Sequence, residues 1–356
     1  MNIIKRITRF IAVFIAAALA LTAFASCMSG KSGEETTAAE EISTARTDVS
    51  SEQQTEKPSD PTPVRVAVLN GTTGFGIAPL YRNVKENYSG NLDITIDFYA
   101  DATLVSPLLI SGTADVAAVP TNLASVLYNK TEGKIKVLAV NTLGVLYLLE
   151  NGNTVNNLSD LRGKTVSVPG QGTNPEYVFR AMLKNSGIEG LEDSVTIDYT
   201  YPSPDELTTA VATGKCSLAV LPEPKVTAAM MKNQSLRVAL DFSAEWKTAT
   251  GAELVQGCLV ARTEFVEAHP EAVAEFCRLY EESVSKVRTD PAAAAADIVY
   301  AGIVPNEALV NAALPKCNIV YLTGEEMKNS LNRFWKSLFD IIPSSVGGKL
   351  PDEGIF

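Results

Sequence analysis

The 356-residue sequence predicts an α/β fold built from two similar units, and two observations lead to this prediction. First, short apolar segments alternate with longer amphipathic segments from Val64 onward, a pattern typical of βαβ units with a parallel sheet. Second, the segment SGTADVAAVPTN at 111–122 is echoed by ATGKCSLAVLPEP at 212–224, which places Pro120 and Pro222 102 residues apart. Each segment reads as a buried strand that ends at a proline.

The first unit is predicted between residues 64 and 140. Its strands are expected at Val64–Leu69, Asp93–Tyr99, Asp115–Val119 and Lys134–Val140, and its helices at 77–86, 102–110 and 122–128. Asp101 suits the N-cap position of the second of these helices, because its side chain can accept a hydrogen bond from a free N–H group. The order is βαβαβαβ, which predicts a sheet with helices on both faces.

The second unit repeats the same order. Its strands are expected at Lys164–Val168, Ser194–Thr200, Leu218–Leu221 and Leu236–Asp241, and its helices at 175–185, 204–213 and 225–232. Two less regular strands, Gly144–Glu150 and Glu253–Ala261, are expected to carry the chain from one unit to the other and back. The remainder, from Glu264, is predicted to be mostly helical, at 270–288, 291–300, 306–313 and 324–339.

The proline at the end of each repeated strand predicts an edge that faces a ligand. The carboxyl ends of parallel strands lie beside helix N-termini with free N–H groups, where ligands of α/β proteins bind. A proline fixes φ and lacks a donor, so the chain turns there instead of extending the sheet. We therefore expect the ends at Pro120 and Pro222 to face each other across a cleft.

Residues 1–26 predict an export signal that is not part of the fold. Three basic residues precede the apolar run Phe10–Phe24, whose 15 residues are fewer than the roughly 20 that span a bilayer. The run ends at Phe24, and Phe24-Ala25-Ser26-Cys27 resembles the lipobox of bacterial lipoproteins, although Phe24 departs from the usual Leu. In such a lipobox Cys27 becomes N-terminal and carries the lipid. Cleavage after Ala25 by ordinary signal peptidase, which would release a soluble protein, is the alternative.

Residues 27–62 predict a disordered linker behind the lipid anchor. The 36 residues from Met28 to Pro63 contain 12 Ser or Thr, 8 acidic and 3 basic residues, and few large apolar side chains. Such a segment cannot bury enough apolar surface to order itself. As a flexible tether it reaches about 30 Å. A stalk of this kind favours the lipoprotein interpretation, with the protein on the extracytoplasmic face of the cell membrane.

Charge and residue types exclude several classes of function. The net charge of −11 argues against binding to nucleic acid or to an anionic membrane surface. The four later cysteines are Cys216, Cys258, Cys277 and Cys317. They lack C-x-x-C spacing and a nearby histidine, so no zinc site is expected. We interpret them as small buried residues, and a disulfide between two of them is the alternative. The single histidine, His269, suits a helix start. Without another histidine, neither a Ser-His-Asp triad nor a Cys-His pair can be built. We expect no metal, no cofactor and no catalytic residue.

Five segments resemble those of a known protein family. They are VRVAVLNGTTGFGIAPLY, GTADVAAVPTNLASVLYNKTEGKIKVLAVNTLGVLYLLENG, LSDLRGKTVSVPGQGTNPEYVFRAML, ALPKCNIVYLTGEEMK and SVGGKLPDE. With them the chain resembles the solute-binding lipoproteins of bacterial ABC transporters, in the group that includes nitrate, sulfonate, taurine and thiamine-pyrimidine-precursor binding proteins. The resemblance covers essentially all of 63–356. Ser217 departs from the family, which often has Asp there, as Asp115 does in the first unit.

The resemblance implies a type II periplasmic-binding-protein fold, in which two lobes are joined by two hinge strands with a ligand cleft between them. Lobe 1 would comprise 63–146 plus 258–356 and lobe 2 would comprise 147–257, with hinges at 144–150 and 253–261. Ligand binding then closes the lobes, and the closed form delivers a small solute to an ABC permease with its ATPase.

Ligand contacts are expected at the strand ends of both lobes. The candidate residues are Thr73, Gly74, Phe75, Thr121, Asn122, Asn141, Thr142, Gly172, Thr173, Asn174 and Glu223. Gly74 lets the backbone approach a ligand, and Phe75 is expected to stack on it. Free N–H groups before the helix at 175–185 favour an anion or a polar acceptor. Glu223 is interpreted as a ligand contact, with a solvated turn as the alternative.

These loops contain no Arg or Lys, which sulfonate or nitrate binding proteins would be expected to use. A neutral or heteroaromatic solute is therefore slightly preferred over a strongly anionic one. An enzyme of the same fold, of the pyrimidine-precursor synthase or menaquinone-pathway type, is the alternative function, and the export signal argues against it. A two-lobed sensor domain is a third interpretation, and it predicts a second membrane segment.

Overall fold

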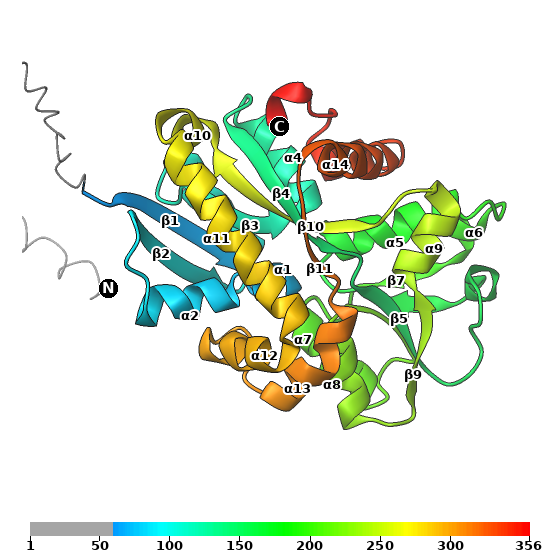
Figure 1. Cartoon of the computed structure of the whole chain (residues 1–356). Helices are drawn as coiled ribbons and strands as arrows, with labels where there is room; N and C mark the ends of the chain where they lie inside the picture. Colours follow the sequence, from blue (N-terminus) through cyan, green and yellow to red (C-terminus); the bar gives the residue numbers. More distant parts are fainter. Residues whose placement is uncertain (1–59) are drawn as a thin grey trace, which may run out of the picture. The chain divides into compact units, whose positions relative to one another are not determined.

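The computed structural model describes residues 60–356, which fold around two β-sheets (Figure 1). The predicted signal peptide, Cys27 and all but the end of the predicted linker lie outside the described residues. Strand β1 begins at Thr62, the last residue of that linker. None of the helices between residues 60 and 356 is both long and apolar enough to cross a membrane.

The first sheet has six strands in the order β11-β4-β10-β3-β1-β2. Their bounds are β1 Thr62–Leu69, β2 Leu92–Tyr99, β3 Val116–Pro120, β4 Ile135–Leu143, β10 Val255–Arg262 and β11 Ile319–Leu322. Strand β1 is parallel to both β2 and β3, whereas β10 is antiparallel to its neighbours β3 and β4. Strand β11 pairs antiparallel with β4 at the edge.

The second sheet has five strands in the order β7-β6-β8-β5-β9. Their bounds are β5 Leu146–Asn151, β6 Thr165–Ser167, β7 Thr196–Asp198, β8 Leu218–Pro222 and β9 Leu236–Asp241. Strands β6, β7 and β8 are parallel, and β5 lies antiparallel between β8 and β9.

The predicted α/β fold with two units is confirmed, and the four strands predicted in each unit run in the same direction. The sheets are nevertheless mixed, because each also receives a strand from the other unit. Strand β5 follows β4 of the first sheet and inserts into the second sheet; β10 follows the second unit and inserts into the first. A strand that arrives from the other unit enters at the carboxyl edge, so it runs opposite to the strands that end there. Each sheet is mixed for this reason.

Helices cover both sheets. Those that surround the first sheet are α1 Thr72–Phe75, α2 Ala78–Glu86, α3 Ala102–Ser111, α4 Thr121–Lys130, α10 Thr263–Ala268, α11 Pro270–Thr289, α12 Pro291–Tyr300, α13 Glu307–Ala313 and α14 Gly324–Phe339. Those of the second sheet are α5 Asn174–Asn185, α6 Leu191–Ser194, α7 Pro204–Ala212, α8 Lys225–Lys232 and α9 Phe242–Thr250. Short 3-10 turns lie at 158–161, 314–316, 343–346 and 353–355.

We call the first sheet with its helices lobe 1, and the second sheet with α5–α9 lobe 2. The chain passes between the two sheets at Gly144–Val145 and again at 251–254. The lobe boundaries inferred from the resemblance stay a prediction. The predicted cap at Asp101 is confirmed, because its carboxylate accepts a hydrogen bond of 2.7 Å from the Thr103 N–H at the start of α3.

One hydrophobic core cluster extends through both lobes, and α14 lies at its centre. Helix α14 contacts α4 of lobe 1 and α5 of lobe 2, and Figure 1 shows it between them. The rings of Phe334 in α14 and Trp246 in α9 have centroids 5.6 Å apart, and both side chains are fully buried. Aromatic side chains of this size contribute much of the burial in a core. Helix α14 therefore helps to hold the two lobes together.

A buried carboxylate ties three strands of lobe 1 at the edge opposite to the lobe boundary. Asp115, just before β3, is 2% exposed and accepts hydrogen bonds from Arg65 Nε at 2.8 Å and Nη2 at 2.6 Å. Arg262, at the end of β10, donates to the same carboxylate at 3.1 Å. Burial raises the pKa of Asp115, but the hydrogen bonds from the two arginines outweigh it and leave this pKa below its ordinary value.

We predict that Asp115→Asn lowers the free energy of unfolding by about 2 to 3 kcal/mol. Breaking a buried pair costs about 3–5 kcal/mol, and water screens the half-exposed Arg65, which reduces the cost. Urea unfolding followed by circular dichroism measures the change. The loss should be complete above the ordinary pKa of 3.8 and should shrink as the pH falls through the lowered pKa of Asp115, since the carboxylate is then protonated in the parent too.

Asp340→Asn is the matched control, because Asp340 pairs with Lys336 on the surface of α14, where both side chains are at least half exposed. It should cost less than about 1 kcal/mol. Equal losses in the two variants would contradict the structural role of the Asp115 cluster.

Candidate functional site

The carboxyl ends of the two sheets lie close together because the chain connecting them is very short. Pro120 at the end of β3 is paired with Gly257 of β10, which is paired in turn with Thr142 of β4. In the second sheet Pro222 is paired with Leu146, at the start of β5. Thr142 and Leu146 are four residues apart, and four residues span at most about 14 Å. The two proline-ended strands therefore end near the same boundary.

On the lobe 1 side of this boundary, three predicted residues form one hydrogen-bonded group. The Asn141 amide donates to the Thr73 carbonyl at 3.3 Å and to the Tyr280 hydroxyl at 3.0 Å. The Thr142 hydroxyl donates to the Asn141 Oδ1 at 3.0 Å. A Cβ on Gly257 would lie 2.5 Å from that oxygen, so only glycine fits there. The structure thus brings Thr73, Asn141 and Thr142 together.

Phe75 does not lie where the sequence analysis expected it. The segment from Thr72 to Phe75 forms a single helical turn, α1, which directs the Phe75 ring inward. The ring is fully buried in the lobe 1 core, in the same cluster as Val66 and Ile77. In this position Phe75 packs within lobe 1 and does not face a ligand. Gly74 remains next to the boundary, with a backbone that leaves little space: a Cβ on it would lie 3.0 Å from the Leu69 carbonyl.

The start of α4 is covered by the C-terminal part of the chain. The indole of Trp335 in α14 donates to the Thr121 carbonyl at 3.0 Å, and the Asn122 amide donates to the Ser345 carbonyl at 3.2 Å. Thr121 is fully buried and Asn122 is 8% exposed. Sequence reasoning placed both residues at this helix start but did not predict that α14 covers them.

On the lobe 2 side, the start of α5 already holds a carboxylate. The N–H of Gly172 donates to Glu176 Oε2 at 2.6 Å, and Glu176 also accepts from Tyr199 and Arg180. Burial raises the pKa of Glu176, but these hydrogen bonds outweigh it and leave the pKa below its ordinary value. The predicted preference of this loop for an anion is therefore partly met by a side chain of the protein itself. Gly172 and Thr173 are exposed, and Asn174 is 8% exposed.

Glu223 is buried at the boundary, so the solvated-turn interpretation is wrong. It is 1% exposed and accepts hydrogen bonds from the Thr227 N–H at 3.1 Å and hydroxyl at 2.9 Å. Lys316, from the turn after α13 in lobe 1, places its Nζ 3.9 Å from the same carboxylate. Burial raises the pKa of Glu223, against the opposing effects of Thr227 and Lys316.

Lys316 corrects the expectation that no cation lies at the predicted site. It belongs to the segment ALPKCNIVYL, 93 residues beyond Glu223 in the sequence, and comes from the other lobe. The Tyr147 hydroxyl of β5 donates to the Lys316 carbonyl at 3.4 Å, which adds a second contact between the lobes. The charge of Lys316 faces a carboxylate.

A third segment, which the sequence analysis did not predict, supports the crossing at Gly144–Val145. Asn318, just before β11, donates to the Gly144 carbonyl at 2.5 Å and accepts from the Leu143 N–H at 3.1 Å. The Val145 N–H donates to Gln256 Oε1 at 2.5 Å, and its carbonyl accepts from the Glu223 N–H at 2.9 Å. The crossing is therefore held from both sheets, and the bond between Val145 and Gln256 joins the two predicted hinges.

Helix α9 is the other element that the sequence analysis missed. Its N-cap is Asp241, which accepts from the Ser243 N–H at 2.8 Å, and Gly251 ends it with a left-handed φ of 67°. This Asp…Gly bracket is the signal that could have revealed it. Strand β9 is parallel to β8, since both are antiparallel to β5, so α9 begins at the same boundary as Glu223.

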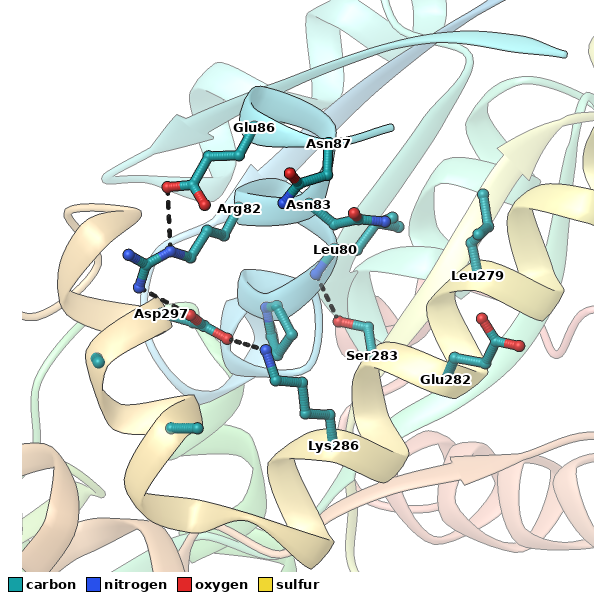
Figure 2. Close-up of a pocket in the computed structure, with 13 residues that line it drawn as sticks. Leu80, Arg82, Asn83, Glu86, Asn87, Leu279, Glu282, Ser283, Lys286 and Asp297 are labelled. Atoms are coloured by element: carbon teal, nitrogen blue, oxygen red, sulfur yellow. Dashed lines mark hydrogen bonds and ion pairs between the residues drawn. The ribbon is translucent and has the colours of Figure 1, made fainter. Parts of the chain in front are cut away.

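Two surface cavities lie elsewhere in lobe 1. Figure 2 shows one of about 530 Å³ between α2, α11 and α12, where the Asp297 carboxylate lies between Arg82 at 3.2 Å and Lys286 at 2.8 Å. Its charged groups satisfy one another, and Arg82 also pairs with Glu86. A second cavity of about 800 Å³ lies beside the end of α3 and α10. Neither contains any predicted ligand residue.

The cysteines and possible metal ligands offer no further chemistry. All four cysteines of the described part are free thiols: Cys216, Cys258, Cys277 and Cys317. Cys258 and Cys317 are buried, and burial raises the pKa of both thiols. Among residues 60–356, no group of three or more His, Cys, Asp or Glu side chains gathers in a way that could hold a metal ion.

Several solved structures share this fold. An ABC transporter protein from Parabacteroides distasonis is 26% identical, with a TM-score of 0.70 over 83% of this chain and 98% of that one. The periplasmic aliphatic sulphonate binding protein SsuA from Escherichia coli is 13% identical, with a TM-score of 0.66 over 82% and 90%. The alkanesulfonate-binding protein SsuA from Xanthomonas axonopodis pv. citri, bound to MOPS, is 14% identical, with a TM-score of 0.62 over 83% and 96%.

The sequence comparison identifies the family. No curated protein matches the chain. The sequence model of the family described as NMT1/THI5 like matches residues 75–294, which is more than half of the 356 residues. The resemblance predicted from the sequence motifs is thus confirmed. The chain belongs to the NMT1/THI5-like family and has the two-lobed fold of the periplasmic binding proteins of ABC transporters.

Proposed function

We propose that the protein captures a small solute between its two lobes and delivers it to the permease of an ABC importer. The observation that carries this proposal is the pair of proline-ended strands, β3 and β8, which end at one boundary with polar helix starts from both lobes beside them. A ligand held there contacts both lobes at once, so its binding favours one relative arrangement of the lobes.

The packing at this boundary implies that the lobes must separate before a ligand can enter. Thr121 is 0% exposed, and Asn141, Thr142 and Glu223 are each 1% exposed. The chain crosses between the lobes only through 144–145 and 251–254 in the described part, and such short connections are where hinge motion is absorbed. We infer that opening breaks the contacts of Lys316 with Glu223 and Tyr147.

The charges at the boundary favour a neutral or heteroaromatic solute. The α5 amide at Gly172 is engaged by Glu176, and Lys316 faces Glu223, so neither is free to neutralise an anion. The similarity in fold to sulphonate binding proteins keeps sulfonates among the candidates. A small number of polar groups in an otherwise apolar setting suits a heterocycle held by amides and hydroxyls.

The N-terminal region completes the proposal. We infer that Cys27 carries a lipid and that residues 27–62 form a tether, which keeps the folded part close to the permease on the extracytoplasmic face of the membrane. Fold alone does not distinguish transport from catalysis. An enzyme of the pyrimidine-precursor synthase or menaquinone-pathway type is the alternative, and the buried Glu223 with its raised pKa is the group that it would use as a general acid.

We predict that the purified protein binds a small molecule with a Kd of micromolar or tighter, about −8 kcal/mol or more favourable, and returns it unchanged. A thermal-shift screen of sulfonates, nitrate, pyrimidines, amino acids and riboflavin-like heterocycles identifies the ligand, and calorimetry gives its Kd. Mass spectrometry of the ligand after overnight incubation tests for turnover. A converted product would support the enzyme alternative, and the absence of any hit would contradict both functions.

We also predict that Cys27→Ser abolishes retention of the protein in the membrane fraction while the Kd for the screened ligand stays the same. The substitution removes the only thiol that the lipobox offers. Immunoblots of membrane and soluble fractions provide the measurement. Ser26→Ala is the matched control and should leave the protein in the membrane fraction. Retention of the Cys27→Ser variant would rule out lipid anchoring at this residue.

A third prediction concerns the buried carboxylate. Burial raises the pKa of Glu223 above the ordinary value of 4.5, so ionisation of this carboxyl opposes the packed arrangement. A carboxyl whose pKa is raised by folding stabilises the folded state fully at a pH below its ordinary pKa. This stabilisation is lost as the pH rises through the pKa of the folded state. Glu223→Gln should therefore raise Tm at pH 7 by about 2–4 °C. The gain should vanish by about pH 4, where the parent carboxyl is protonated.

Scanning calorimetry of the parent and the variant between pH 4 and pH 8 measures this difference. Glu282→Gln, at a side chain of α11 that is 62% exposed, is the control and should change Tm little at any pH. A lower Tm for Glu223→Gln at pH 7 would show that the attraction of Lys316 outweighs burial.

A further inference from the structure

Buried polar atoms without partners gather at three helix starts. In residues 60–356, eight buried side-chain nitrogen or oxygen atoms have no hydrogen-bond partner. Five of them belong to α4, α5 and α9, within the first two turns of each helix: Thr121 Oγ1, Asn122 Oδ1, Asn174 Oδ1, Ser243 Oγ and Trp246 Nε1. The other three, on Tyr88, Asn129 and Arg262, are on other elements or at the far end of α4.

Such atoms are rare in folded proteins, because a buried polar group without a partner loses its hydrogen bonds to water. Thr121 and Trp246 are fully buried, and Asn122 and Asn174 are each 8% exposed, so none of the four lies open on the surface. Thr121 also faces the Cys258 thiol, whose pKa its hydroxyl lowers slightly, and a thiol is a weak partner. The inference therefore rests on the remaining atoms at these helix starts, which are Asn122 Oδ1, Asn174 Oδ1, Ser243 Oγ and Trp246 Nε1.

The three helix starts belong to one region of the molecule. Helix α14 contacts α4 and α5. Its Trp335 donates to the Thr121 carbonyl at 3.0 Å, while its Phe334 packs on Trp246 at 5.6 Å. Ser243 lies against the crossing, since a Cβ on Gly144 would collide with its hydroxyl oxygen. The rings of Phe242 in α9 and Phe179 in α5 stack at 5.7 Å. The helices that carry the unpartnered atoms therefore adjoin one region, α4 from lobe 1 and α5 and α9 from lobe 2.

The chemistry of these atoms restricts the ligand. The Asn122 nitrogen donates to Ser345, which fixes the amide so that its Oδ1 can only accept a hydrogen bond. The Trp246 indole nitrogen can only donate one. Satisfying both requires a ligand with a donor and an acceptor. A sulfonate or nitrate ion offers acceptors alone, so it would leave the Asn122 oxygen without a partner.

Resting on the proposed function, we infer that α9 forms a third wall of the ligand site through Ser243 and Trp246, and that the ligand carries both hydrogen-bond donors and acceptors. An uncharged heterocycle with an N–H next to a carbonyl or ring nitrogen meets this requirement. Ser243 and Asn174 then act as specificity-determining residues in lobe 2, opposite Asn122 in lobe 1.

Ser243→Ala and Asn174→Ala separate ligand binding from structure. Each removes a polar atom that has no partner in the protein, so Tm without ligand should stay the same or rise slightly. The Kd should rise about five- to thirtyfold, because a buried group of the ligand loses its partner. Ser125→Ala is the matched control: its buried hydroxyl donates to the Val346 carbonyl at 2.8 Å, so it should lower Tm and leave the Kd unchanged.

Matched probes test the ligand class directly. Thermal shift and calorimetry compare uracil with 1,3-dimethyluracil, which lacks the N–H donors, and ethanesulfonamide with ethanesulfonate. We expect binding of a donor-bearing member of a pair, with at least tenfold weaker binding of its donor-free partner, and loss of that binding in Ser243→Ala.

The possible outcomes are distinct. Tighter binding of ethanesulfonate or dimethyluracil would overturn the donor requirement and leave the proposed function intact. A donor-bearing probe whose Kd is the same in Ser243→Ala and Asn174→Ala would overturn the role of lobe 2. A fall in ligand-free Tm in both variants, as large as that of Ser125→Ala, would show that these side chains are structural. Absence of binding by all four probes would contradict the inferred ligand class, and the wider screen would then decide the proposed function separately.

Discussion

The exchange of one strand between the sheets determines the rest of this structure. Strand β5 leaves the first sheet and pairs with β8, and β10 returns to pair with β3. Both enter at the carboxyl edge, so each proline-ended strand lies beside an incoming strand. Because Leu146 lies only four positions after Thr142, the two edges cannot move far apart without a change at the crossing. The candidate site lies at this boundary for that topological reason.

The contacts between the two lobes are apolar on one side of this boundary and polar on the other. The apolar contacts of α14 with α9 and α5 hold one side of the lobes together. The contact of Lys316 with Glu223 is polar and, at 3.9 Å, long for an ion pair. At that separation the attraction contributes little stability, so the contact can be broken at small cost.

Much of the fold could be predicted from local patterns, because α8, α12, α14 and β9 have the predicted bounds and Asp101 caps α3. The insertion of β10 between β3 and β4 could not, since this pairing joins residues far apart in the sequence. Candidate site residues could be inferred from the sequence only where a motif marked them, as at Thr121 and Asn141. Lys316 and Trp246 were missed because tertiary packing brings them there, and Phe75 was misplaced because a single helical turn redirects it.

A crystal structure of the protein with the compound that gives the largest thermal shift tests the central claim most directly. The account predicts electron density for that compound at the boundary between the sheets, in contact with α4 of lobe 1 and with α5 or α9 of lobe 2. Density confined to one lobe, such as the cavity lined by Arg82 and Asp297 in Figure 2, would contradict it.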